Sequence, residues 1–193
     1  MSAGGVEALR TLVSTLPEDF PAAVLVVLHI SPTGPSVLPQ ILTRAGPLPA
    51  RHPADGELLT GGVILVASPD RHLAVSGAQA RILTSPRDRG HRPSADLLLR
   101  SAAVAFGPAC CGVVLSGTMD DGAAGLAEVR RAGGLALVQD PADALFPGMP
   151  RAAIEQADPQ HVAPVSALAG AVGAWLAERG GETALPQPER WPG

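Results

Sequence analysis

Short, uninterrupted apolar runs are the feature of this sequence that most restricts its fold. Residues 22–28, 112–115 and 135–139 are of strand length and lack the polar alternation of a half-exposed strand. Continuous apolarity is typical of strands buried on both faces of a parallel sheet. Stretches with helical spacing lie between the runs. We therefore predict a single α/β domain with a doubly wound, mostly parallel sheet and flanking helices.

Apolar spacing predicts the helices, and a change of pattern in the middle of the chain predicts a small insert. Helices are expected at residues 6–16, 36–45, 94–106, 123–132 and 165–178, with a shorter one after Pro150. Between residues 61 and 84, short strand-like pieces are separated by Pro69-Asp70 and Ser76-Gly77. This arrangement is typical of antiparallel hairpins.

Composition favours one globular domain that does not bind nucleic acid and does not insert into a membrane. We place the domain at residues 1–178 and interpret the Gly- and Pro-rich residues 179–193 as a disordered tail. The net charge of -4, without a basic stripe, argues against nucleic-acid binding. No apolar stretch reaches the length of a membrane span and no signal peptide precedes the first helix, so the cytoplasm is the expected location.

The cysteines and two of the histidines give no sign of a metal site. Cys110 and Cys111 are adjacent, and adjacent cysteines bridge only with unusual backbone geometry. They lack the Cys-x-x-Cys spacing and the histidine partners of a zinc site. We interpret them as buried thiols in a reducing compartment and expect neither metal nor cofactor. His52 and His72 are interpreted as surface or turn residues.

Ser2, His29 and Asp121 are residue types that form a nucleophilic relay, and each precedes a helix-like segment. In an open parallel sheet, loops converge beyond the carboxyl ends of the strands, where His29 and Asp121 fall. An imidazole oriented by a carboxylate can activate a serine hydroxyl. Simpler interpretations stay open for each residue: a structural histidine, an Asp-Asp-Gly helix cap, and a phosphate-binding Ser-x-Gly-Gly loop.

Five stretches carry a more specific signal together than any of them does alone. They are SAGGVEAL (residues 2–9), VVLHI (26–30), HRPSAD (91–96), LSGTMDDGAAG (115–125) and PGMPRAAI (147–154). In this order, and to about residue 178, they resemble the catalytic domain of the CheB-type chemotaxis receptor methylesterases. The resemblance implies hydrolysis of glutamyl methyl esters on the cytoplasmic helices of chemoreceptors, and in many members deamidation of receptor glutamines.

The resemblance also implies roles for individual residues. Ser2 matches the nucleophile, His29 the base and Asp121 the orienting carboxylate. Thr118 matches a position, often Met in the family, whose backbone N–H helps to hold the oxyanion.

Two further residues are candidates for the substrate cleft, Arg92 and Met119. For the segment around Arg92, an ordinary helix start at Pro93-Ser94 fits equally well, and Asp96 shares this ambiguity.

The sequence departs from the family pattern in two places. Members usually carry a receiver domain ahead of the esterase, so we expect this chain to be constitutive or controlled by a separate receiver-domain partner. In the family an apolar strand runs directly into the nucleophile, whereas only Met1 precedes Ser2 here. A missing buried strand would leave backbone groups of its neighbours unpaired. We therefore expect the true start to lie upstream.

Other functions compete with the leading hypothesis. A catalytically inactive module could bind receptor or signalling proteins through the same cleft. An amino-terminal nucleophile hydrolase would use the α-amine of Ser2 as its base. A Rossmann-like nucleotide binder lacks the acidic residue expected about 20 residues after the glycines, a place near which His29 stands instead.

Overall fold

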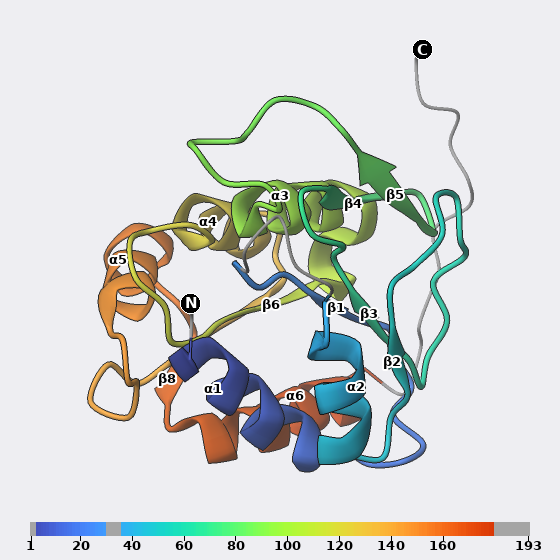
Figure 1. Cartoon of the computed structure of the whole chain (residues 1–193). Coiled ribbons are helices and arrows are strands. Elements are labelled where there is room, and N and C mark those ends of the chain that lie inside the picture. The colour runs from blue at the N-terminus through green and yellow to red at the C-terminus, as the bar shows by residue number, and fades with distance from the viewer. Residues whose placement is uncertain (1–2, 30–35, 180–193) are drawn as a thin grey trace.

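Two three-stranded parallel half-sheets form the middle layer of the fold (Figure 1). The computed structural model describes residues 3–29 and 36–179. The strand order is β1-β3-β2 in one half-sheet and β6-β7-β8 in the other. The strands are β1 (Val24–Val26), β2 (Ala50–Arg51), β3 (Ile64–Val66), β6 (Cys111–Val114), β7 (Leu135–Gln139) and β8 (His161–Ala163). Every pairing within the half-sheets is parallel, as predicted.

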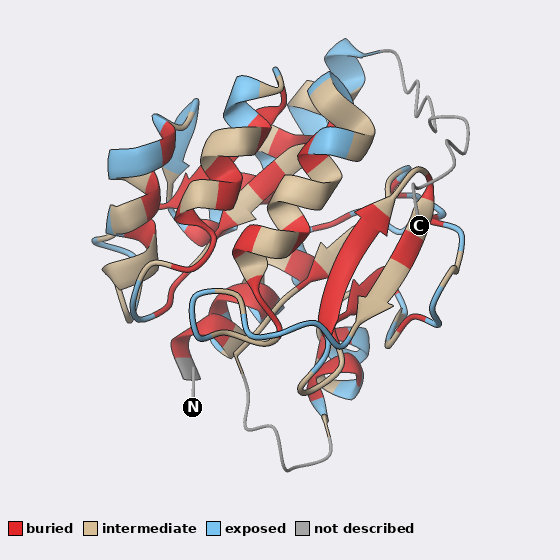
Figure 2. Cartoon of the chain, turned by 90° about the horizontal axis from the view of Figure 1, so that it is seen from above, coloured by how far each residue is buried: buried red, intermediate tan, exposed pale blue. Residues whose placement is uncertain are grey.

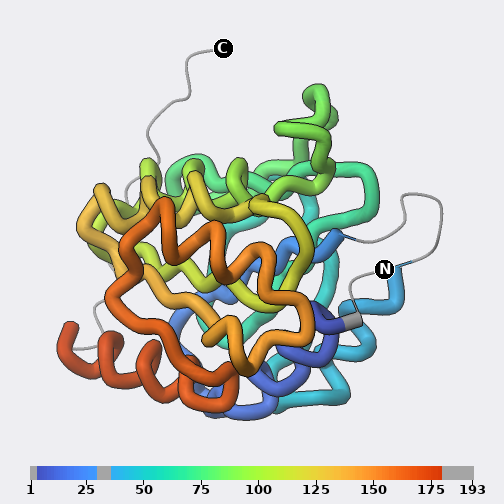
Figure 3. The backbone as a smooth tube through the Cα atoms, turned by 90° about the vertical axis from the view of Figure 1, so that its left-hand side faces the viewer, coloured from blue at the N-terminus to red at the C-terminus, as the bar shows by residue number. Residues whose placement is uncertain are grey.

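Helices cover both faces of this layer, so the predicted doubly wound α/β architecture is confirmed. One helical layer contains α1 (Ala3–Ser14), α2 (Leu38–Ala45) and α6 (Val165–Glu178). The other contains α3 (Ala95–Phe106), which continues into the short 3-10 helix η1 (Gly107–Ala109), α4 (Ala123–Arg131) and α5 (Gly148–Ala157). Figure 3 shows α6 on the same side of the molecule as α1, away from α4.

Burial follows from this layering. Ile64 and Leu137 in the strands, and Leu42 and Leu168 in the helices, have no solvent-exposed surface and belong to one core cluster. Leu98 of α3 and Leu126 of α4 are buried in clusters with strand residues, whereas Val104 of α3 and Arg130 of α4 are exposed. Figure 2 shows the molecule from above, coloured by burial. Within the part of the chain that the structure describes, no helix has the length and apolar character needed to cross a membrane.

The middle of the chain contains one antiparallel hairpin, β4 (His72–Ser76) with β5 (Gln79–Leu83), which confirms the predicted insert. The strand-like piece at residues 63–67 is not part of a hairpin, because β3 lies between β1 and β2 in a parallel half-sheet. The interpretation of His72 as a surface or turn residue was wrong. Its side chain is completely buried in β4, and Nε2 lies 3.1 Å from the carbonyl oxygen of Pro86.

Cys110 is buried and Cys111 is half-buried, and neither forms a disulfide. Cys110 ends the turn before β6 and Cys111 begins this strand. Burial raises the pKa of the Cys110 thiol to about 12, and burial also raises the pKa of Cys111. Both thiols are therefore protonated near neutral pH. The predicted burial is confirmed for Cys110, whereas Cys111 keeps part of its surface exposed.

Candidate active site

His29 and Asp121 meet at the carboxyl ends of the two half-sheets. His29 follows β1 and Asp121 follows β6, and His29 Nε2 lies 2.9 Å from Asp121 Oδ2. This is the distance of an ion pair, although the approach angle falls outside that of a well-formed hydrogen bond. The His29 side chain keeps 30% of its surface exposed and that of Asp121 only 3%. The imidazole is thus open to a ligand on one side, while the carboxylate behind it is closed to water.

The N-terminus of α3 holds the Asp121 carboxylate. Oδ1 accepts hydrogen bonds from Ser94 Oγ at 3.1 Å and from the Asp96 backbone N–H at 2.9 Å. Oδ2 accepts from the Ala95 backbone N–H at 2.7 Å. A helix N-terminus favours negative charge because its first N–H groups lack partners within the helix. The sequence of α3 therefore supplies a preformed anion site for the relay carboxylate.

These contacts fix the charge state of Asp121. Burial alone would raise the pKa of its carboxyl, but the neighbouring His29 ring and the N–H groups of Asp96 and Ala95 outweigh burial and lower the pKa to about 2. Asp121 is consequently ionised at neutral pH. An ionised carboxylate beside Nε2 favours a proton on that nitrogen, which leaves Nδ1 of His29 free to accept one.

His91 is the third polar ring at this site. Its ring centroid lies 4.5 Å from that of His29, with an angle of 31° between the planes. His29, His91 and Asp121 each offer a possible metal ligand atom within 4.8 Å of the others, and two imidazoles with a carboxylate suit several transition metals. The two rings lie close together and tilted, as in an aromatic pair.

Two backbone hydrogen bonds of Gly117 hold the loop that carries Thr118. The Gly117 N–H donates to the carbonyl of Phe146 at 2.9 Å, and the Gly117 carbonyl accepts from the Met149 N–H at 2.9 Å. A Cβ on Gly117 would lie 2.1 Å from Met149 Sδ, so only glycine allows this close approach. Among the described residues, the Thr118 N–H donates to no acceptor. Thr118 is exposed, so its N–H is available to a bound anion.

The two candidates for the substrate cleft lie in different settings. Met119 is 63% exposed and has a positive φ of 72°, which is uncommon for a residue other than glycine. Arg92 donates to Asp70 through Nε at 3.0 Å and Nη2 at 2.8 Å, and its Nη1 donates to the carbonyls of Thr84 and Ser85. The Arg92 guanidinium therefore holds the loop next to His91 in place.

The sequence left open a position of Asp96 in the substrate cleft, but its side chain is buried away from solvent. It is 1% exposed, and its Oδ1 accepts hydrogen bonds from Gly122 N–H at 3.0 Å and Gly125 N–H at 2.7 Å at the start of α4. The alternative reading of that segment, a helix start, is confirmed. Ser94 is the N-cap of α3, and its Oγ accepts from the Leu97 N–H at 3.2 Å.

Ser2 lies outside the described residues, so its distance from His29 is not part of this geometry. The nearest described glycine, Gly4 in the first turn of α1, lies against Ser116, because a Cβ at that position would be 2.6 Å from Ser116 Oγ. Ser116 immediately follows β6 and precedes the Thr118 loop. The start of α1 is thus close to the same sheet edge as Asp121.

Sequence reasoning missed two contributors to the site, His91 and Ser94. Both stand in the HRPSAD stretch, but the ring stack and the bond to Asp121 join residues distant in sequence. Their only signal was membership of that stretch.

Comparison with known proteins agrees with the resemblance carried by the motifs. The model of the CheB methylesterase family matches residues 1–172. A protein-glutamate methylesterase/protein-glutamine glutaminase of Anaeromyxobacter dehalogenans is 42% identical over 91% of this chain and 52% of its own length. The protein-glutamate methylesterase FrzG of Myxococcus xanthus is 35% identical over 91% of this chain and 53% of its own. The chain spans about half the length of these curated relatives.

The fold agrees with a solved structure as well. The crystal structure of the Thermotoga maritima CheB methylesterase catalytic domain superposes with a TM-score of 0.84. The two sequences are 27% identical, and the match covers 89% of this chain and 93% of that one. The likeness therefore extends over nearly the whole of both chains.

Proposed function

Since this chain belongs to the CheB methylesterase family, we propose that it hydrolyses glutamyl methyl esters on the cytoplasmic helices of chemoreceptors and releases methanol. Ser2 is the nucleophile, His29 the general base and Asp121 the orienting carboxylate. The contact of 2.9 Å between His29 Nε2 and Asp121 Oδ2, at the sheet edge where α1 begins, is the observation that carries this proposal. The reaction needs no metal or cofactor.

The mechanism follows from the charge state of the pair. Ionised Asp121 stabilises the imidazolium that forms when His29 Nδ1 takes the proton of Ser2 Oγ. Ser2 Oγ then attacks the ester carbonyl carbon. Methanol leaves with the proton from His29, and a covalent acyl-enzyme on Ser2 Oγ remains. Water, deprotonated by the same imidazole, then attacks the acyl carbon. The bond to Ser2 Oγ breaks, His29 returns the proton to this oxygen, and the glutamate side chain is released.

The developing oxyanion requires N–H donors that are not already engaged. The Thr118 N–H meets this requirement. Its loop is held by the backbone hydrogen bonds of Gly117 with Phe146 and Met149. A pinned donor costs little reorganisation during the reaction. Because the N–H belongs to the backbone, the threonine side chain at this position is compatible with the role.

Recognition of the receptor involves the rim of the site. Met119 presents an exposed apolar side chain there, and Arg92 orders the loop that carries His91. We infer that the substrate is a methylated chemoreceptor helix, that glutamine deamidation shares the relay, and that a separate receiver-domain protein regulates the activity in the cytoplasm. Residues 1–178 make up the catalytic domain.

Methanol release from methylated receptor tests the proposal. We expect Ser2→Ala to abolish release, while Ser14→Ala, an exposed serine later in α1, leaves it unchanged. If the Ser2 variant still released methanol, the assignment of Ser2 as the nucleophile would be rejected. Receptor binding without methanol release in the unmodified chain would instead favour the inactive binding module.

A further inference from the structure

Three side chains at the active site combine the kinds of ligand atom that zinc prefers. His29, His91 and Asp121 each place one possible ligand atom within 4.8 Å of the other two. Two imidazole nitrogens and one carboxylate oxygen are a common zinc ligand set, in which water takes the fourth position. The mechanism of ester hydrolysis uses His29 and Asp121, but it leaves His91 without a role.

The carboxylate of Asp121 is oriented for a further ligand on the side of His29. A carboxylate offers about four lone-pair positions, two on each oxygen. Oδ1 accepts hydrogen bonds from Ser94 Oγ and the Asp96 N–H, which use both of its positions. Among the described residues, Oδ2 accepts only the Ala95 N–H, so one position beside His29 stays open. Hydrogen bonds that orient a ligating carboxylate in this way typically raise metal affinity about 10- to 100-fold.

The Nε2 atom of His29 is the second oriented ligand. This nitrogen is shielded from solvent and, within the described part of the chain, makes no well-formed hydrogen bond, although Asp121 Oδ2 lies 2.9 Å away. Buried polar atoms of this kind are usually completed by water or an ion. Two bonds of about 2.1 Å at a tetrahedral angle separate the ligand atoms by roughly 3.4 Å. An ion between the two side chains therefore requires them to separate by only about 0.5 Å more.

His91 supplies the third ligand from a fixed backbone. Its N–H donates to the carbonyl of Asp88 at 2.8 Å, and the Asp88 N–H donates to the carbonyl of His91 at 3.0 Å. The side chain of His91 is partly exposed, and its ring centroid lies 4.5 Å from that of His29. Rotation of the His91 side chain therefore brings a ring nitrogen toward the other two ligands while the backbone stays in place.

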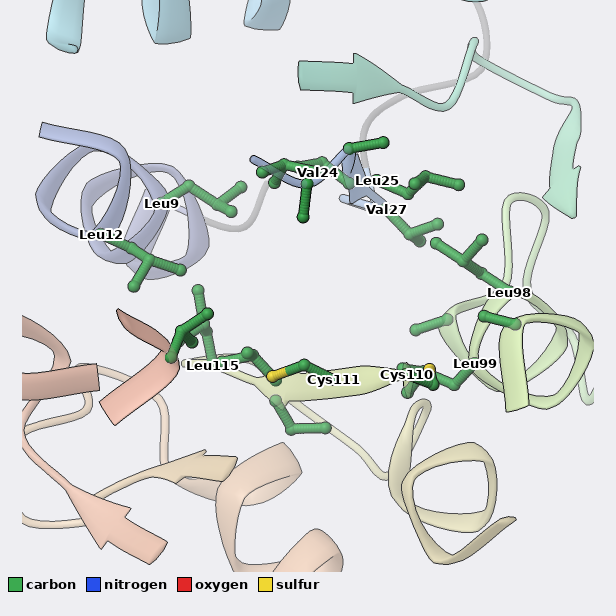
Figure 4. A pocket seen from close by; sticks show the side chains of 18 of the residues that line it. Leu9, Leu12, Val24, Leu25, Val27, Leu98, Leu99, Cys110, Cys111 and Leu115 are labelled. Carbon is green, nitrogen blue, oxygen red and sulfur yellow. The ribbon is translucent and has the colours of Figure 1, made fainter. Parts of the chain in front are cut away.

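The two cysteines lie away from these ligands. Cys110 and Cys111 stand at the start of β6, whereas Asp121 follows the end of this strand. Both cysteines line an apolar cavity of about 770 Å³ between β1 and β6, in which Cys110 packs with Leu99 (Figure 4). Zinc binds the thiolate, a form that apolar surroundings disfavour. The histidine and aspartate ligands are therefore the better zinc site.

We propose that His29, His91 and Asp121 bind one Zn²⁺ ion and that the bound ion stops ester hydrolysis. The ligands are His29 Nε2, one ring nitrogen of His91, Asp121 Oδ2 and a water molecule. A neutral imidazole carries one proton, so zinc on Nε2 leaves this proton on Nδ1. Nδ1 is the nitrogen that must accept the proton of Ser2 Oγ. The inhibition, unlike the metal site itself, therefore rests on the proposed function.

Zinc binding is measured first, without substrate, by isothermal titration calorimetry on the full chain purified without a histidine tag. We expect one zinc ion per chain, and at least roughly tenfold weaker binding by His91→Gln and by His29→Gln. His161→Gln changes an exposed histidine of β8 and should bind zinc like the unmodified chain. Circular dichroism checks that each variant is folded. Equal affinity of the unmodified and His91→Gln proteins overturns the metal site.

Methanol release from methylated receptor then tests the inhibition. Zinc at about 100 times its dissociation constant should lower the release rate on the order of 100-fold, and EDTA should restore it. His91→Gln, compared with its own rate without zinc, should need at least roughly tenfold more zinc for the same relative loss. An unchanged release rate with zinc bound overturns the inhibition.

The two measurements separate this proposal from the methylesterase function. Zinc binding by a chain that releases no methanol even after EDTA treatment supports the metal site and counts against the activity. Methanol release by a chain that binds no zinc supports the activity and counts against the metal site.

Discussion

Asp121, which precedes α4, binds the N-terminus of α3, and Asp96, in the first turn of α3, binds the N-terminus of α4. The Asp121 carboxylate, just before α4, accepts N–H groups from the first turn of α3, including that of Asp96 itself. The Asp96 carboxylate, in the first turn of α3, accepts the N–H groups of Gly122 and Gly125 at the start of α4. The position of the relay carboxylate is thereby coupled to the packing of α3 against α4.

These reciprocal hydrogen bonds predict that Asp96→Ala lowers both the unfolding free energy and kcat. It leaves two buried N–H groups without their acceptor, at a cost of roughly 1–3 kcal/mol of unfolding free energy each. A shift of Asp121 by about 1 Å could lower kcat up to roughly 100-fold. Asp96→Asn keeps an oxygen acceptor and should recover most of both losses. Urea unfolding and methanol-release kinetics measure the two effects.

The control for this prediction is Glu155→Ala, an exposed residue on α5. It should change the unfolding free energy by no more than about 0.5 kcal/mol. An Asp96→Ala protein that loses stability but keeps its kcat would restrict Asp96 to a role in the fold.

The low pKa of Asp121 predicts a contribution to stability that depends on pH. Its pKa of about 2 in the folded protein lies below the ordinary value of 3.8, so the stabilisation is complete above the unfolded pKa and disappears as pH falls toward 2. The shift corresponds to about 2 kcal/mol. Asp121→Asn should flatten the dependence of unfolding free energy on pH between about 4 and 2. An unchanged slope in urea titrations of the variant would contradict this assignment.

Comparison of the wild type with the variant is required, because Asp96 acts in the opposite direction. Burial raises the pKa of the Asp96 carboxyl, with a further contribution from the Asp121 charge, despite the hydrogen bond from Gly125. Its ionisation therefore costs stability as pH rises.

The elements predicted best from the sequence are those with the clearest periodic pattern. β7 and α6 have the predicted bounds, because a continuous apolar run and a long apolar helix face are local signals. β2 was not predicted, since two residues carry no periodicity. The separation of β1 from β6 is a tertiary property that no window of the sequence contains.

The candidate site shows the same division. Local pattern placed His29 and Asp121 at the ends of two strands, and the structure brings them into contact. The hydrogen bond from Ser94 to Asp121 spans 27 positions, and the ring pair of His91 and His29 also joins residues far apart in the sequence. Neither has a spacing rule, so neither could be predicted.

Loss of the relay imidazole should remove activity without removing the fold. We expect His29→Gln to lower kcat on the order of 10⁴-fold, the effect typical of removing one member of a relay. His161→Gln, at an exposed position of β8, is the matched control and should leave kcat unchanged. Full activity in the His29 variant would instead point to the α-amine of Ser2 as base.

The close contact between Gly117 and Met149 makes the last prediction a test of the oxyanion loop. A Cβ at residue 117 would lie 2.1 Å from Met149 Sδ, so Gly117→Ala must displace either the methionine or the loop that carries the Thr118 N–H. Such overpacking typically costs about 1–3 kcal/mol, and a displaced donor should lower kcat. Met149→Ala removes the obstructing sulfur. In the double variant we expect the loss of unfolding free energy to be smaller than the sum of the two single losses by about 1 kcal/mol or more, with partial recovery of kcat. Strict additivity in urea unfolding, or a single Gly117 variant with wild-type kcat, would show that the loop tolerates the added methyl group and that its position does not govern the oxyanion site.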